Sequence, residues 1–221
     1  MKEPIVINLS GAPGSGKSTG AAYVFTKLKQ LGINCELVGE VAKDATWEHN
    51  TMALSCQEYL FGKQSYRLAR CRDKVDVIIT DSPLPLGLIY NKNPALDSNF
   101  TNVVMNIFNT YENINFFLTR TKPYNPRGRN QTEEESDNLN TLIKSLYDEL
   151  GIKYIIVNGD NNGYQYIVDH VCKLLNDNGE CNLNKNNDYR TCQNCKHGFY
   201  QDFITCASCH DLSNWEQGEI L

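Results

Sequence analysis

The chain has 221 residues and a mass of 25.1 kDa, enough for one ordinary α/β domain with a small appendage. Hydrophobic residues make up 41% and charged residues 21%, a mixture that excludes a wholly disordered or fibrous protein. With 21 Lys and Arg against 26 Asp and Glu the formal net charge is -5, which excludes a global positive field that would attract nucleic acid or an anionic membrane.

The amino-terminal residues do not resemble an export signal. Polar Asn8 and Ser10 come too early for the apolar region of a signal peptide, and no later run approaches the roughly 18 apolar residues of a membrane span. We therefore expect a cytoplasmic protein, in the host cytoplasm if it is viral. Its nine cysteines are then expected as reduced thiols rather than disulfides.

Five short β-rich segments alternate with longer helical patterns over residues 1–175. The expected strands are residues 4–10, 34–38, 75–80, 115–119 and 153–157. The expected helices are residues 18–31, 52–72, 102–110, 133–150 and 163–175, and Thr132 is expected to cap the fourth of them. Alternation of this kind is typical of α/β proteins with a mainly parallel sheet.

A phosphate-binding loop follows the first expected strand. Residues 11–19 match the pattern G-x-x-x-x-G-K-[ST] at every fixed position, between a strand and a helix. The residues expected to bind ATP here are Gly11, Ala12, Pro13, Gly14, Ser15, Gly16, Lys17, Ser18 and Thr19. Backbone N–H groups surround the phosphates, Lys17 bridges the β- and γ-phosphates, and the Ser18 hydroxyl binds Mg²⁺. A glycine-rich turn that only caps the helix is the alternative. The predicted fold is a P-loop NTPase three-layer sandwich with a five-stranded sheet.

Two carboxylates follow the second and third expected strands. Asp81 ends a buried strand, where open α/β sheets bind their ligands, so it is a candidate Mg²⁺ ligand beside Ser18. The next residue is Ser82, whereas hydrolytic P-loop motors usually have a water-activating Glu there, and this favours an acceptor other than water. Glu40 is a candidate base for an attacking hydroxyl. The alternatives are a turn-capping Asp and a solvent-exposed loop Glu.

A basic segment, residues 120–131, follows the fourth expected strand. Its two prolines and one glycine disfavour regular structure, and it holds four cations. We expect a mobile lid in which Arg127 and Arg129 neutralise charge on the transferring phosphoryl group and Arg120 contacts the nucleotide. A solvated basic loop is the alternative.

The helix expected over residues 52–72 carries polar side chains on one side and several aromatic rings. Gln57, Gln64 and Arg67 share that side at helical spacing. Its aromatic residues, Tyr59, Phe61 and Tyr66, are candidates for stacking on a base, and core packing is the alternative.

The carboxyl-terminal part divides into an Asn-rich linker, residues 176–188, and a cysteine-bearing module, residues 189–221. Cys192, Cys195, Cys206 and Cys209 form two C-x-x-C pairs separated by ten residues. This spacing in a segment without its own hydrophobic core predicts a structural Zn²⁺ site of the zinc-ribbon type. A redox-active dithiol is the alternative. The module lacks a basic stripe, so packing on a partner or on the lid is the expected use.

The motifs of residues 5–170 together resemble the nicotinamide-riboside-kinase-like P-loop kinases, a group common in tailed phages. The resemblance rests on the phosphate loop, the Glu-Val-Ala-Lys-Asp run at residues 40–44, the Asp-Ser-Pro run at residues 81–83 and the Arg-bearing segment after the fourth strand. It implies a parallel sheet between helices, ATP with Mg²⁺ as the donor, and a hydroxyl of a nucleoside or related small molecule as the acceptor. It also implies that the helix bearing Gln64 and Arg67 lines the acceptor site.

The predicted function is an ATP-dependent kinase that acts on a hydroxyl of a nucleoside or nucleotide. One alternative is a DNA kinase that phosphorylates a hydroxymethylated base such as 5-hydroxymethyluridine. Another is a nucleotide-binding switch that recruits a partner. A GTP-specific switch would need Asn-Lys-x-Asp, but residues 91–94 read Asn-Lys-Asn-Pro and lie too early in the chain.

Overall fold

The computed structural model describes residues 3–96, 98–125 and 132–177. Within these residues five strands form one sheet in the order β2-β3-β1-β4-β5, and every pair is parallel. The strands are β1 (Ile5–Ser10), β2 (Cys35–Val38), β3 (Val77–Thr80), β4 (Glu112–Thr119) and β5 (Ile155–Asn158). The five predicted strands are confirmed, and the sheet is parallel throughout.

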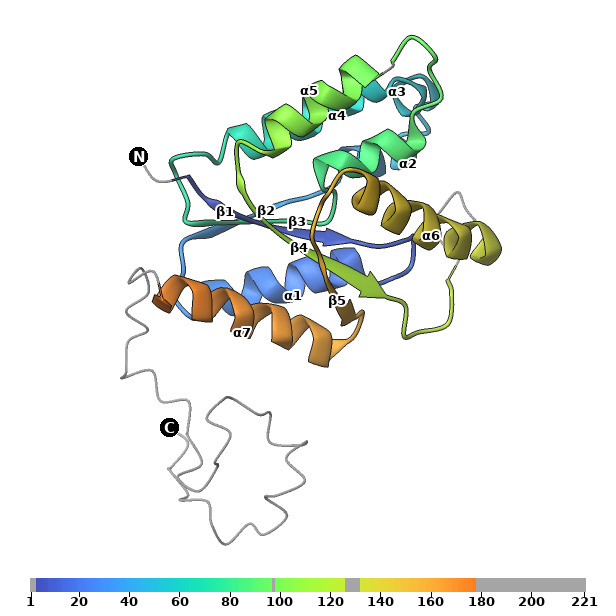
Figure 1. Cartoon of the computed structure of the whole chain (residues 1–221). Helices are drawn as coiled ribbons and strands as arrows, with labels where there is room; N and C mark the ends of the chain where they lie inside the picture. Colours follow the sequence, from blue (N-terminus) through green and yellow to red (C-terminus); the bar gives the residue numbers. More distant parts are fainter. Residues whose placement is uncertain (1–2, 97, 126–131, 178–221) are drawn as a thin grey trace, which may run out of the picture. The chain divides into compact units, whose positions relative to one another are not determined.

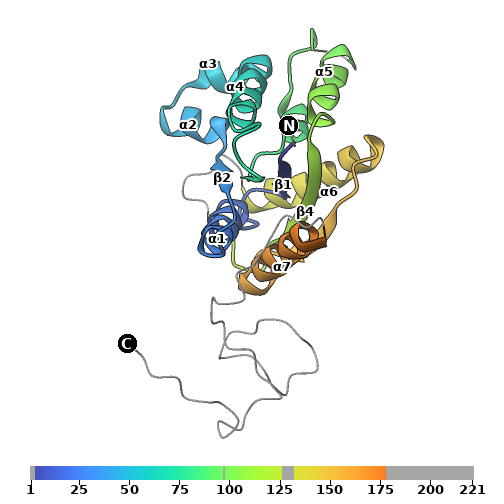
Figure 2. The same cartoon turned by 90° about the vertical axis from the view of Figure 1, so that its left-hand side faces the viewer.

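Helices cover both faces of the sheet and make a three-layer arrangement. They are α1 (Lys17–Gln30), α2 (Val41–Trp47), α3 (Thr51–Ser55), α4 (Gln57–Ala69), the 3₁₀ helix η1 (Leu84–Tyr90), α5 (Ser98–Phe108), α6 (Glu133–Glu149) and α7 (Asn161–Asp177). Helices α1 and α7 lie on one face, and α4, α5 and α6 lie on the other (Figure 1, Figure 2). No helix in these described ranges combines the length and the apolar character needed to cross a membrane.

The central strand β1 explains why both faces need cover. All six of its residues are buried. Ile5 and Ile7 pack into the apolar cluster under α1 and α7, and Val6 packs into the cluster under α5 and α6. Alternating apolar side chains therefore anchor a helical layer on each side of the sheet.

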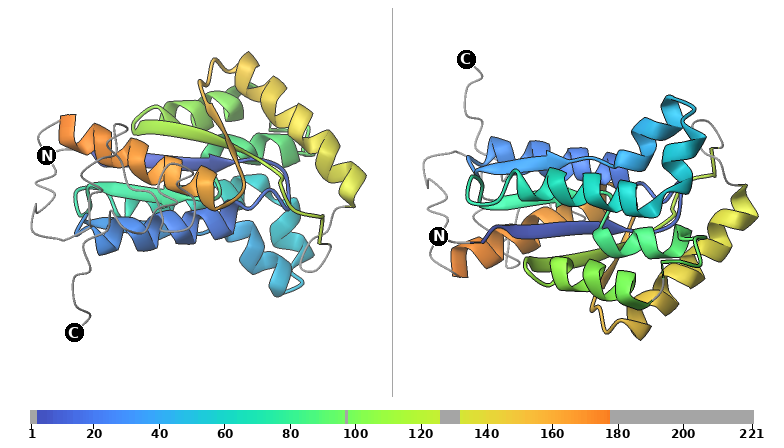
Figure 3. Two further views of the ribbon diagram at one scale, coloured as in Figure 1. Left: turned by 90° about the horizontal axis from the view of Figure 1, so that it is seen from below. Right: turned by 90° about the horizontal axis from the view of Figure 1, so that it is seen from above.

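The carboxyl ends of the strands determine where a ligand can bind. The loop after β1 leads into α1, and Asp81 follows the neighbouring strand β3 directly. Helices α2, α3 and α6 extend beyond this same end of the sheet in both views of Figure 3. The topology thus brings the phosphate loop, Asp81 and the segment after β2 to one edge.

Candidate active site

The loop between β1 and α1 turns on glycines. Gly14 and Gly16 have φ values of 87° and 95°, in the left-handed region that favours glycine. Helix α1 begins directly after Gly16, and no side chain caps its first turn. The first N–H groups of α1 and the positive end of its dipole are therefore available to an anion such as phosphate.

Lys17 folds back over the same loop. Its Nζ donates hydrogen bonds to the carbonyl oxygens of Gly11, at 2.7 Å, and of Ala12, at 3.2 Å. These contacts keep the ammonium group beside the phosphate loop.

Ser18 and Asp81 meet at the start of α1. The Ser18 hydroxyl donates to Oδ2 of Asp81 at 2.5 Å, and Asp81 is only 5% exposed. Its other oxygen, Oδ1, is buried without a hydrogen-bond partner among the residues that the structure describes. A hydroxyl beside an unsatisfied carboxylate oxygen is an oxygen donor set that suits Mg²⁺. The two residues therefore fit the predicted magnesium site.

Glu40 is the half-buried residue directly before α2, at the N-cap position, and its carboxylate makes no capping hydrogen bond to that helix. Burial raises its pKa above the ordinary glutamate range, the charge of Lys17 lowers it, and the charge of Asp81 raises it again. Glu40, Lys17 and Asp81 all line the same cavity. The candidate base and the phosphate loop are thus brought together.

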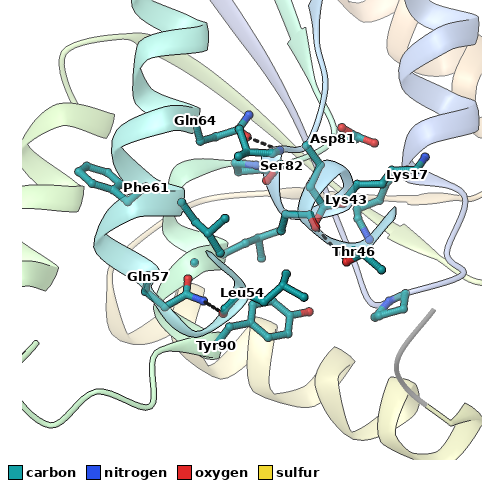
Figure 4. Close-up of a pocket in the computed structure, with 18 of the residues that line it drawn as sticks. Lys17, Lys43, Thr46, Leu54, Gln57, Phe61, Gln64, Asp81, Ser82 and Tyr90 are labelled. Carbon is teal, nitrogen blue, oxygen red and sulfur yellow. Dashed lines mark hydrogen bonds between the residues drawn. The ribbon is translucent and has the colours of Figure 1, made fainter. Parts of the chain in front are cut away.

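A cavity of about 730 Å³ includes much of the phosphate loop and continues from it toward α3, α4 and α5. Lys17 and Asp81 lie at one end in Figure 4, and Gln57, Phe61 and Tyr90 lie at the other. Its walls come from α2, α3, α4, η1 and α5, and most of the side chains beyond the phosphate loop are apolar or uncharged. The volume and lining are those of a pocket for a small organic molecule.

Tyr90, the last residue of η1, lines the cavity. Burial, and after it the charge of Glu40, raises the pKa of Tyr90 to about 12. Its hydroxyl therefore keeps its proton at neutral pH and can donate a hydrogen bond to a ligand.

Two residues after β5 support the phosphate loop, and sequence reasoning missed both. A Cβ on Gly159 would lie 1.9 Å from the backbone oxygen of Ser15, so only glycine fits this approach. The Tyr164 hydroxyl donates to the carbonyl oxygens of Gly16, at 3.1 Å, and of Gly159, at 2.9 Å. A glycine directly after the last buried strand, in Asn158-Gly159, was the available signal.

Helix α6 supports the loop from another side. The Ser136 hydroxyl donates to the Pro13 carbonyl at 2.7 Å, and the Asn140 side-chain oxygen accepts from the Ala12 N–H at 3.0 Å. About two turns further along α6, the Tyr147 hydroxyl is hydrogen-bonded to the Ser10 hydroxyl at 2.5 Å. No sequence signal identifies these pairs, because their partners are more than 100 residues away.

The remaining predicted residues fall in three places. Thr19 lines the large cavity, as Ser18 does. Arg120 instead pairs with Glu133, at 3.1 Å, and with Asp137, at 2.6 Å, both at the start of α6. Arg127, Arg129 and the four cysteines Cys192, Cys195, Cys206 and Cys209 lie outside the described residues. In the part of the chain that is described, no group of three or more His, Cys, Asp or Glu side chains could hold a metal ion.

The aromatic residues of α4 fall into two groups, one in the cavity wall and one exposed. Phe61 lines the cavity, whereas Tyr59 and Tyr66 are exposed and do not belong to its walls. Gln57 and Gln64 line it too, and both are buried. Arg67 reaches back to the segment before α2.

Comparison with known proteins places the chain in a family. A family model described as an AAA domain matches residues 6–165, well over half of the chain. No curated protein matches the chain. The matched range contains the phosphate loop, Glu40 and Asp81 and ends just after Tyr164. This match does not test the finer resemblance to nicotinamide-riboside-kinase-like kinases, which stays a prediction. The geometry of the loop and the family match agree on a nucleotide-binding P-loop domain, and the chain belongs to the AAA domain family.

Proposed function

We propose that the protein is a kinase that transfers the γ-phosphate of ATP to a hydroxyl of a nucleoside or nucleotide. The observation that carries this proposal is the cavity of about 730 Å³ that opens beside the phosphate loop. The cavity includes the phosphate loop and extends past it to residues of α3, α4 and α5, and an enzyme that transfers phosphate only to water has no need for that extension. The cavity therefore supports an organic acceptor.

The described residues suit such a transfer. Lys17 stays beside the phosphates and offsets negative charge on them. Ser18 and Asp81 would hold Mg²⁺, which would offset further negative charge on the phosphate oxygens. Glu40 accepts the proton of the acceptor hydroxyl while that oxygen bonds to the γ-phosphorus. The bond from the γ-phosphorus to the β–γ bridging oxygen breaks, and ADP leaves.

Phosphate transfer from γ-labelled ATP to a panel of acceptors tests the proposal. The panel holds nucleosides, nucleotides and DNA that contains 5-hydroxymethyluridine, and Lys17→Ala is the control that removes the phosphate-binding cation. Labelled product from a free nucleoside or nucleotide supports the proposal. Product only from the DNA favours the DNA kinase, and tight ATP binding without transfer to any acceptor favours a nucleotide switch.

The lid arginines belong to this proposal from sequence alone. If they act mainly in the transition state, Arg127→Ala and Arg129→Ala lower kcat by about 10²-fold or more and change the ATP dissociation constant less. Single-turnover transfer and equilibrium ATP binding, measured for both variants, check this expectation. Equal losses in rate and affinity would contradict a catalytic lid and favour a switch that holds nucleotide in its ground state.

The four-cysteine zinc site is likewise a proposal from its spacing. We expect one Zn²⁺ per chain, bound by thiolates that supply the folding free energy of the module. Elemental analysis of freshly reduced protein checks the stoichiometry. The matched control is the variant with Cys206→Ser and Cys209→Ser, which should lose the metal. A wild-type protein without bound metal would contradict the zinc-ribbon proposal.

A further inference from the structure

We infer that Gln64 and Arg67 of α4 are positioning residues that fix the backbone of Glu40 and so aim its carboxylate. The inference rests on the proposed function, in which Glu40 is the base. Neither residue is assigned a role by the family match.

Gln64 forms hydrogen bonds with the backbone on both sides of Glu40. Its side-chain oxygen accepts from the Val41 N–H at 3.0 Å, and its side-chain nitrogen donates to the Gly39 carbonyl at 3.3 Å. These two backbone groups belong to the peptide units before and after Glu40. Holding both units restricts φ and ψ of the residue between them, and with them the direction of its Cα–Cβ bond.

Arg67 reinforces the same segment from one turn further along α4. Its Nη1 donates to the Gly39 carbonyl at 3.1 Å, and its Nη2 pairs with the carboxylate of Asp44 on α2. One guanidinium thus ties the residue before Glu40 to the helix after it. Gln64 is 5% exposed, so its two hydrogen bonds compete little with water.

Glu40 borders the large cavity and also a second cavity of about 340 Å³, whose other lining residues include Asp44 and Arg67. For a side chain that borders open space, the backbone direction at its Cα decides which way it can point. The side-chain oxygen of Gln64 satisfies the Val41 N–H, and the Glu40 carboxylate makes no capping hydrogen bond to α2.

The charged groups around Glu40 make its titration a measure of its position. They are Lys17 from α1, Lys43 and Asp44 from α2, and Asp81 after β3, and the Tyr90 hydroxyl of η1 lies within reach of its charge. Burial is the largest influence and raises the pKa of Glu40. If Glu40 swings toward water, that influence weakens and its pKa falls.

The experiment combines carboxyl ¹³C NMR titration of Glu40 with single-turnover hydrolysis of Mg-ATP, in which water stands in for the acceptor hydroxyl. Gln64→Met keeps the length of the side chain and removes both hydrogen bonds. Arg67→Lys keeps a cation beside Asp44 but removes the guanidinium group that contacts Gly39 and Asp44 at once. It serves as a second variant if Gln64→Met folds poorly. Lys63→Ala, on the exposed side of α4, is the matched control.

We expect a lower Glu40 pKa in both variants and about 10-fold slower hydrolysis in Gln64→Met, with Lys63→Ala unchanged. In a Glu40→Gln background, Gln64→Met should slow hydrolysis less than about twofold further, because there is no base left to position. An unchanged or higher Glu40 pKa in variants with wild-type melting temperatures overturns the inference. Hydrolysis that Glu40→Gln does not slow instead contradicts Glu40 as base, whatever its pKa does.

Discussion

Glu40 combines two properties that oppose each other. As a base it must give up its proton, yet burial raises its pKa and favours the protonated form. Because its folded pKa lies above its unfolded one, the stability it contributes is present at pH values below the unfolded pKa and is lost as pH rises through the folded pKa. At pH values above its folded pKa, the ionised carboxylate of Glu40 therefore costs stability.

The substitution Glu40→Gln separates the two properties. We expect it to raise the melting temperature of the nucleotide-free protein at neutral pH, because it removes a poorly solvated charge, and to lower phosphate transfer by about 10²- to 10⁴-fold. In wild-type protein the acid limb of the rate profile should lie above the ordinary glutamate pKa. Calorimetry and transfer rates measured from about pH 4 to about pH 8, a range that begins near the ordinary glutamate pKa and extends above it, check this. A variant that loses both stability and rate would indicate a structural role.

At the scale of single residues, the sequence identified the groups that carry charge. The phosphate loop, Glu40 and Asp81 stand at recognisable positions relative to buried strands, and the structure brings them to one edge of the sheet. It could not identify the groups that hold them. Gln64 was expected to line the acceptor site and it lines the large cavity, but its hydrogen bonds to Gly39 and Val41 depend on how α4 docks.

At the scale of elements, the predicted strands are all present, and their ends shift for physical reasons. Strand β4 begins at Glu112 rather than 115, because the Asn113 side chain donates to the carbonyls of Phe108 and Tyr111 and accepts from Asn8. Polar residues that satisfy their hydrogen bonds in this way can occupy a central strand. A hydrophobic pattern does not reveal such bonds.

The helical elements show where sequence patterns fail. The helix predicted over residues 52–72 is interrupted at Cys56, which has φ of −108° and ψ of 89°, and α3 and α4 lie on either side. Helix α2 has seven residues, too few for a clear period, and η1 carries two features that predict a loop, Pro85 and Gly87. These elements line the large cavity, so the cavity was the least predictable part of the molecule. The capping box of Thr132 and Glu135 at α6, by contrast, confirms the predicted cap.

Gly159 makes a prediction at this scale, because it joins β5 and α7 to the phosphate loop. Gly159→Ala places a methyl group against the Ser15 and Thr119 carbonyls and should destabilise the domain by about 1–3 kcal/mol and weaken ATP binding. Gly62→Ala, inside α4 with open space around it, is the control and should stabilise by about 0.5–1 kcal/mol. Urea denaturation and ATP titration of both variants check the pair. Wild-type stability in Gly159→Ala would mean that the two loops do not touch.

At the scale of the whole molecule, nucleotide should stabilise the fold, since its site uses β1, β3, α1 and the loop after β2 together. Mg-ATP at about 100 times its dissociation constant adds about 2.7 kcal/mol, or about 5–10 °C in Tm. Differential scanning fluorimetry with and without EDTA measures the shift. Lys17→Ala should lose most of it while it keeps the Tm of the free protein. A full shift in that variant would contradict the phosphate role of Lys17.

The Tyr164 hydroxyl has a consequence for how the site is made on the ribosome. It donates to the carbonyls of Gly16 and Gly159, and so links the amino-terminal loop to a helix about 150 residues later, at positions 16 and 164. A nascent chain that has emerged only as far as β4 carries the complete phosphate-binding motif without the residues that shape it. Nucleotide binding should therefore begin only after α7 leaves the exit tunnel. The growing polypeptide then does not bind ATP before its sheet is complete.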